Sequence, residues 1–134
     1  MDETSKAADV TDAPAARTKV LIVDHGTTVL PSIVQIVNDL GHEVQVCASG
    51  IAVIVAEGYR PDVAIFDIAM PGPYTCDLLT DFRRALPHIP VVLMGLQVDA
   101  RTVEHLLNKE AFAYITKPFT PALIAGTLDA ALRA

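Results

Sequence analysis

Five short apolar segments recur along this chain, and segments with helical periodicity separate them. The apolar segments are five or six residues long and rich in β-branched side chains: KVLIVD (19–24), EVQVCA (43–48), DVAIFD (62–67), PVVLMG (90–95) and FAYIT (112–116). Continuous apolar runs of this length are typical of strands that are buried on both faces. Their alternation with helices predicts an α/β domain in which helices cover both sides of a parallel sheet.

The helical segments carry their own start and stop signals. The first, over 28–40, has Thr27 or Thr28 as its N-cap, Pro31 in its first turn and Gly41 as its stop. We expect the other helices to begin after Ser49, to cover about 76–86 and 99–109, and to open with Thr120 as N-cap before Pro121. Right-handed crossovers leave few arrangements for five β–α units. The commonest is a flavodoxin-like (βα)5 doubly wound sheet with strand order 2-1-3-4-5.

The first eighteen residues differ in composition from the rest of the chain. They are charged residues, alanine, threonine and proline, and Val10 is the only large aliphatic residue after Met1. Segments of this kind bury too little apolar surface to offset the entropy of ordering. We therefore predict a disordered tail over 1–18 and one folded domain over 19–134.

Charge, hydropathy and cysteine content exclude several classes of protein. The net charge is −6 and the basic residues are scattered apart from Arg83 and Arg84, so we expect no direct binding to nucleic acid. No apolar run approaches the roughly 18 residues that a membrane span needs, and the acidic start is not a secretory signal. Cys47 and Cys76 have no metal-site spacing, which favours reduced core thiols and a cytoplasmic location.

Charged residues stand where the predicted strands end. Asp24 and His25 end the strand at 19–24, Asp67 ends the strand at 62–67, and Lys117 follows the strand at 112–116. In open α/β sheets, ligands bind beyond the carboxyl ends of the strands, at the switch point between strands one and three. A buried carboxylate is costly unless an opposite charge compensates it. We therefore expect Lys117 to lie near Asp67, either as a structural partner or in a site where Asp67 reacts or coordinates a cation.

Three segments carry a family resemblance over essentially 19–134. VLIVDH, DVAIFDIAMPG and YITKPF, in this order and at these spacings, resemble the signature segments of response-regulator receiver domains in two-component signalling. The resemblance implies that Asp67 accepts a phosphoryl group from a phosphohistidine and that Lys117 binds the phosphoryl oxygens. It also implies Mg²⁺ held by Asp24, Asp67, the backbone carbonyl of Ala69 and the position of His25. The peptide bond after Lys117 is expected to be cis, as only X–Pro bonds readily are.

The chain departs from the family pattern at three positions. His25 replaces a second acid, and imidazole is a poor ligand for Mg²⁺, so we expect weak magnesium binding. Gly95 replaces a serine or threonine whose hydroxyl binds the phosphoryl group, and Leu96 replaces a small residue and could partly cover Asp67. Tyr114 falls at the family's aromatic switch position. We therefore expect the coupling between phosphorylation and Tyr114 to be weakened.

Three functions are consistent with these residues. The favoured one is a receiver that accepts a phosphoryl group on Asp67 from a histidine kinase or phosphotransfer protein. Such a protein is not an enzyme beyond its own phosphorylation and dephosphorylation. The second is a pseudo-receiver that binds partners without phosphorylation. The third, an FMN-binding protein, is the weakest, because the chain is 5% aromatic with no Trp and because Asp67 and Lys117 would have no role.

The partners are predicted to be proteins. The chain ends after the last predicted helix, so we expect an unidentified output protein to receive the signal. The first helix is apolar over more than one face, which often indicates an interface. Val29 and Leu30, at its start, are the candidates for docking the phosphodonor.

Overall fold

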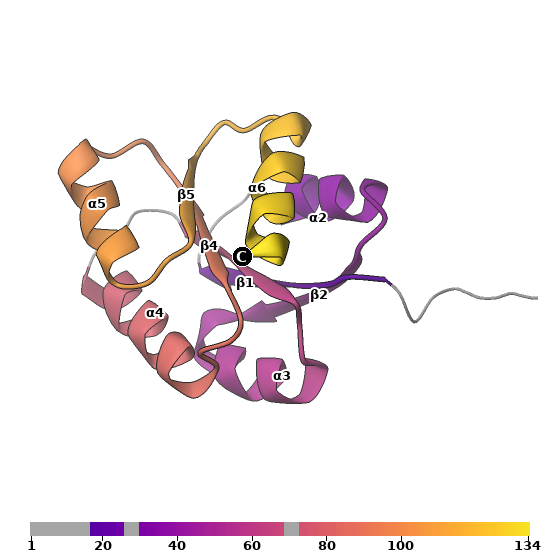
Figure 1. Cartoon of the computed structure of the whole chain (residues 1–134), viewed down its shortest axis with the longest axis horizontal. Helices are drawn as coiled ribbons and strands as arrows, with labels where there is room; N and C mark the ends of the chain where they lie inside the picture. The colour runs from indigo at the N-terminus through magenta and orange to yellow at the C-terminus, as the bar shows by residue number, and fades with distance from the viewer. Residues whose placement is uncertain (1–16, 26–29, 69–72) are drawn as a thin grey trace, which may run out of the picture.

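The computed structural model describes residues 17–25, 30–68 and 73–134, and within them the chain forms a five-stranded parallel sheet in the order β2-β1-β3-β4-β5 (Figure 1). The predicted flavodoxin-like order is therefore confirmed. The strands are β1 (Lys19–His25), β2 (Glu43–Ala48), β3 (Val63–Ile68), β4 (Val91–Gly95) and β5 (Ala113–Thr116). The helices are α2 (Leu30–Asp39), the 3₁₀ turn η2 (Ser49–Ile51), α3 (Ala52–Tyr59), α4 (Pro73–Ala85), α5 (Ala100–Asn108) and α6 (Pro121–Arg133).

The predicted element boundaries differ from the observed ones by at most three residues, and those of β2 match. Strand β3 runs to Ile68, so Asp67 is its second-last residue rather than its last. Helix α4 begins at Pro73, three residues before the predicted start, because proline is favoured in the first turn of a helix. The predicted N-cap at Thr27 or Thr28 and nearly all of the predicted tail lie outside the described residues.

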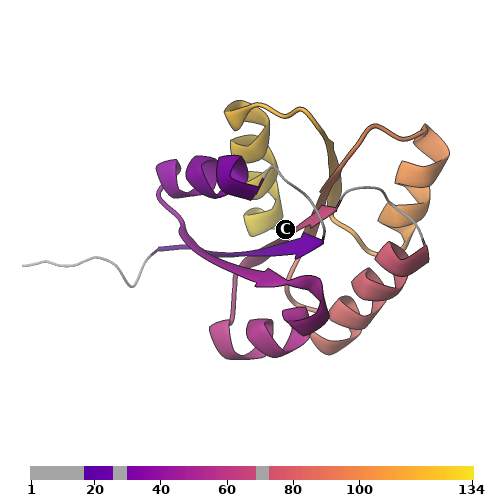
Figure 2. The ribbon, with the colours of Figure 1, turned by 180° about the vertical axis from the view of Figure 1, so that it is seen from behind.

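Two layers of helices bury the two faces of the sheet (Figures 1 and 2). Neighbouring residues of a strand point to opposite faces, as Val20 and Leu21 do, so each strand contributes to both layers. One layer packs α3, α4 and α5 around Phe66 and Phe82, whose rings meet edge to face with centroids 5.1 Å apart. The other packs α2 and α6 against Ile22 and Ile65. This burial on both faces explains why the strands read as continuous apolar runs.

The cysteines belong to the first of these layers. Cys47 is buried within it, Cys76 packs against it, and both are free thiols. Burial raises the pKa of the Cys47 thiol above its ordinary value, which favours the unreactive protonated form. None of the helices in the described parts of the chain has the length and apolar character needed to cross a bilayer.

Helix ends follow the predicted capping signals where the structure describes them. Gly41 has φ of +90°, and its N–H donates to the Asn38 carbonyl at 2.9 Å, while the His42 N–H donates to the Val37 carbonyl at 3.3 Å. This pattern closes α2 with a left-handed residue, and Gly41 is confirmed as the stop. At α6, the Thr120 hydroxyl oxygen accepts a hydrogen bond from the Leu123 N–H at 3.1 Å, as predicted.

Replacing Thr120 by alanine should lower the free energy of unfolding by about 1 kcal/mol, because it removes the side-chain partner of an otherwise unpaired N–H at the start of α6. Thr120→Ser keeps the hydroxyl and is the matched control. Chemical denaturation at neutral pH measures both variants. Equal stability of Thr120→Ala and the native protein would show that this cap contributes nothing.

Candidate functional site

Asp24 and Asp67 lie side by side at the carboxyl end of the sheet. Strands β1 and β3 run parallel with these two residues in register. Both side chains are on the α2 and α6 face, because Ile22 and Ile65, two residues earlier in each strand, belong to that layer. Asp67 has no exposed surface, whereas Asp24 is half-buried. The switch point between strands one and three therefore carries the two predicted carboxylates.

Lys117 supplies a positive charge to this pair. Its Nζ atom lies 2.5 Å from Asp67 Oδ1 and donates to the Ile68 carbonyl at 3.4 Å. The Lys117 N–H donates to the Gly95 carbonyl at 2.8 Å, and this bond anchors the residue after β5 to the end of β4. The peptide bond between Lys117 and Pro118 is cis, as the resemblance implied. The structure thus confirms that Lys117 lies beside Asp67.

The charge balance of this cluster favours a further cation. Two carboxylates and one ammonium group meet at these strand ends, so the formal charge of the described cluster is negative. Among the described residues, no group of three or more His, Cys, Asp or Glu side chains could hold a metal ion. Two carboxylates do fit a hard cation such as Mg²⁺, which binds one or two protein carboxylates and keeps several waters. The predicted ligand Ala69 and the side chain of His25 lie outside the described parts of the structure.

Tyr114 is the second residue of β5 and lies on the face of the sheet opposite to Asp67. Its ring packs against the α3, α4 and α5 layer, and its hydroxyl donates to the Leu96 carbonyl at 2.6 Å. A Cβ atom added at Gly95 would stand 2.5 Å from the Tyr114 Oη atom. Burial raises the pKa of the Tyr114 phenol above its ordinary value. The three predicted switch positions, Gly95, Leu96 and Tyr114, are therefore in direct contact.

A hollow of about 500 Å³ lies next to Lys117, between α2 and the segments that follow β4 and β5. Its lining is Ser32, Ile36, Leu96, Lys117, Pro118 and Phe119. The Leu96 side chain is 48% exposed and forms part of this wall. Of the predicted docking residues, Val29 and the side chain of Leu30 fall outside the described residues. Sequence reasoning missed Ile36 and Phe119, because an apolar residue in sequence does not reveal whether it lines a groove or fills the core.

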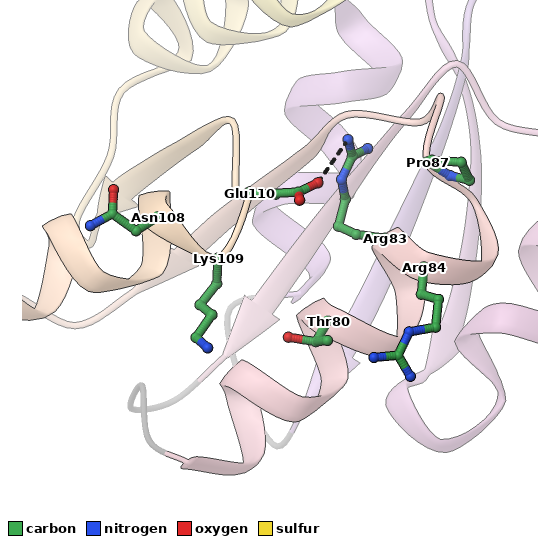
Figure 3. Close-up of a pocket in the computed structure, with 7 residues that line it drawn as sticks. All are labelled: Thr80, Arg83, Arg84, Pro87, Asn108, Lys109 and Glu110. Carbon is green, nitrogen blue, oxygen red and sulfur yellow. Dashed lines mark ion pairs between the residues drawn. The ribbon is translucent and has the colours of Figure 1, made fainter.

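A second hollow, of about 420 Å³, lies between the carboxyl ends of α4 and α5 (Figure 3). Figure 3 shows Arg83 and Glu110 facing each other across it, with an ion pair of 3.6 Å. Arg83 also donates to the Ile89 carbonyl, just before β4 begins. These contacts connect α4 to the segment that follows α5. They are at the amino edge of the strands, so this hollow is separate from the Asp67 cluster.

Comparisons with known proteins agree on one family. The family model described as the response regulator receiver domain matches residues 20–129. The DNA-binding transcriptional regulator NtrC of Azospirillum brasilense is 28% identical over 115 residues, which cover 84% of this chain and 24% of NtrC. The DNA-binding response regulator MtrA of Mycolicibacterium paratuberculosis is 28% identical over 120 residues, which cover 87% of this chain and 52% of MtrA. The chain thus spans about a quarter of NtrC and about half of MtrA.

Solved structures show the same fold. The crystal structure of a CheY-like response regulator receiver domain protein from Methanospirillum hungatei JF-1 superposes with a TM-score of 0.75 at 28% sequence identity. The superposition covers 88% of this chain and 95% of that one.

Replacing Lys117 by methionine should destabilise the protein more than replacing Asp67 by asparagine. Lys117→Met removes the ammonium group from a fully buried carboxylate that also faces Asp24, and losing one partner of a buried pair costs about 3–5 kcal/mol. Asp67→Asn leaves an ammonium group with 11% of its side chain exposed, and it removes the repulsion between the two carboxylates, so its cost should fall below that range.

Urea denaturation of both single variants and the double variant, in metal-free buffer, measures the coupling. We expect the double variant to recover most of the stability that Lys117→Met loses. Strictly additive losses would show that the two side chains do not interact energetically.

Proposed function

This chain belongs to the family of response regulator receiver domains, and from that premise we propose that Asp67 accepts a phosphoryl group from a histidine kinase or phosphotransfer protein. Receiver domains are signalling modules and generally not enzymes. One observation carries the proposal: a fully buried carboxylate at the switch point has Lys117 Nζ at 2.5 Å and a second carboxylate beside it. The proposed acceptor and the cation proposed to bind the phosphoryl oxygens are thus side by side.

The chemistry requires little from the protein beyond position and charge. A carboxylate oxygen of Asp67 attacks the phosphorus of the phosphohistidine, an O–P bond forms, and the N–P bond breaks. The released imidazole takes up a proton from solvent. Lys117 is placed to neutralise the phosphoryl oxygens as a point charge, and it exchanges part of its contact with Asp67 for them.

Asp24 and Asp67 are the described residues that would hold Mg²⁺. When bound, the ion would offset negative charge on the transferred group. We also infer that the backbone carbonyl of Ala69 and the position of His25 contribute to this site. Because His25 replaces an anionic ligand, the affinity for Mg²⁺ should be weak.

The hollow beside Lys117 is the proposed docking place for the phosphodonor. It adjoins the ammonium group that contacts Asp67, and Ile36, Leu96 and Phe119 give it apolar walls. A phosphohistidine that reaches Asp67 must bring its own helix or loop to this side of the sheet. Apolar contacts in the hollow would orient it, and the signal would pass to an unidentified output protein through protein–protein contacts.

A phosphorylation-independent interaction module is the second candidate function. The observation that favours it is at Gly95, where the family's hydroxyl side chain is missing and the Tyr114 phenol occupies the space. Such a module would keep the Asp67–Lys117 pair as a structural element.

Incubation with acetyl phosphate and Mg²⁺ should add one phosphoryl group to the protein, detected by intact mass. Asp67→Asn should abolish the addition, because an amide is not a nucleophile for phosphorus. Asp129→Asn removes a carboxylate that is 71% exposed on α6 and serves as the matched control with unchanged labelling. An unmodified native protein at high donor and metal concentrations would favour the interaction module, and labelling of Asp67→Asn would place the acceptor elsewhere.

His25→Asp should raise the affinity for Mg²⁺ by about tenfold or more. An added anion near 4 Å from the ion contributes up to about 4 kcal/mol per unit charge of the ion at an effective dielectric constant near 20, and the waters that the carboxylate displaces reduce this gain. The native protein should also prefer Mn²⁺ over Mg²⁺ more strongly than the variant does. Calorimetric titrations measure both ions. His88→Asp, at the amino edge of the sheet, adds the same charge as a control; identical Mg²⁺ binding by native protein and His25→Asp would mean that position 25 never contacts the metal.

A further inference from the structure

The Tyr114 phenol occupies the space that a side chain at position 95 would need. An ideal Cβ atom at position 95 would lie 2.5 Å from Tyr114 Oη, 3.4 Å from Tyr114 Cζ and 3.2 Å from Ile68 Cγ1. A carbon and an oxygen that are not bonded cannot approach to 2.5 Å without strong repulsion. Any side chain at position 95 must therefore displace the phenol, which is the movable end of the pair.

The other glycines of the described chain show that this contact is unusual. Gly50, Gly58 and Gly126 have nothing within 4 Å of an added Cβ, and Gly41 is required by its φ of +90°. Gly95 lies in a regular strand without a positive φ. Position 95 therefore requires glycine because a side chain there would collide with Tyr114, and not because of its backbone conformation.

A hydrogen bond holds the phenol in this space. Tyr114 is opposite Leu93 in the β4–β5 register, and its side chain extends along β4 to reach the Leu96 carbonyl at 2.6 Å. Tyr114 is half-buried, and this bond gives its hydroxyl a partner within the protein. The bond therefore connects the middle of β5 to the first residue after β4.

We propose that glycine at position 95 fixes Tyr114 against the end of β4 in the unmodified protein, and that this position does not depend on a phosphoryl group at Asp67. Tyr114 is thus a positioning residue for the β4–α5 connection, which begins with Leu96. The inference goes beyond the proposed function, since it rests on the steric contact and the hydrogen bond alone.

The same geometry limits what a ligand at Asp67 can change. Among the contacts that the structure describes, the Asp67 cluster reaches Gly95 through the Lys117 N–H, which donates to the Gly95 carbonyl, and through Ile68, whose carbonyl accepts from Lys117 and whose Cγ1 atom borders the space above Gly95. Position 95 offers no side chain that could follow a ligand. A ligand shifts a conformational equilibrium only through contacts that differ between the two states. A partner that binds the α5 and β5 face therefore meets the same surface with or without a phosphoryl group.

The test is NMR on protein with isotope-labelled tyrosine rings, with Tyr114→Phe used to assign the Tyr114 signals. In metal-free native protein, we expect Tyr114 ring protons to show contacts with Gly95 Hα and the Ile68 side chain, and the phenol to titrate above the ordinary range. Gly95→Ala should lose both contacts and return the phenol toward its ordinary pKa. Gly126→Ala, an exposed position with open space, should change neither.

Thermal melting keeps the test decisive if Gly95→Ala folds poorly. Gly95→Ala should lower the melting temperature clearly in the native background and much less in a Tyr114→Ala background, where the clashing phenol is gone. Equal losses in the two backgrounds, or preserved ring contacts in Gly95→Ala, would overturn the proposal.

Beryllofluoride with Mg²⁺ tests the second half of the proposal. The ring contacts of Tyr114 should persist when the amides of Asp67 and Lys117 shift, and loss of those contacts on binding would overturn the independence from Asp67. Absence of any shift at Asp67 and Lys117 would count against the proposed phosphorylation. The position of Tyr114 would still be decided by the metal-free spectra and the melting temperatures.

Discussion

The fold around the site depends on one electrostatic constraint: Asp67 is a carboxylate without exposed surface, and a cation must lie within hydrogen-bonding distance of it. Lys117 can reach it only if β5 ends at the same edge of the sheet as β3. Parallel pairing of β3, β4 and β5 meets that condition. The hydrogen bond from the Lys117 N–H to the Gly95 carbonyl then holds Lys117 at the end of β4. Topology and charge compensation are therefore two aspects of one arrangement.

The sequence predicts most of this arrangement, because the relevant signals are local. Apolar runs indicate buried strands, and the carboxyl ends of parallel strands meet at one edge of the sheet. The sequence alone therefore predicts that Asp24, Asp67 and Lys117 lie close together. Thr120 and Gly41 set helix ends through hydrogen bonds to residues within five positions. Such features need no knowledge of how distant segments pack.

The features that the sequence does not predict depend on distant packing. The position of the Tyr114 ring follows from the space above Gly95 and from a carbonyl 18 residues away in the chain. The hollow beside Lys117 combines residues of α2 with residues after β4 and β5, so Ile36 and Phe119 gain a shared role only in three dimensions. The early start of α4 is different in kind, because Pro73 is a local helix-start signal and the prediction began this helix at about residue 76 instead.

The proposed acceptor site and the Gly95–Tyr114 contact lie on opposite faces of the sheet. Asp24 and Asp67 belong to the face covered by α2 and α6, whereas Gly95 and Tyr114 belong to the opposite face. Ile68 touches both: its carbonyl accepts a hydrogen bond from Lys117, and its Cγ1 atom borders the space above Gly95. Because position 95 has no side chain, a structural change at the Asp67 site can reach Tyr114 only through backbone and packing contacts of this kind. The proposed acceptance of a phosphoryl group uses Asp67, Lys117 and Asp24 and needs no side chain at position 95. We therefore propose that this chain combines the acceptor site of its family with a Tyr114 position that is fixed by Gly95.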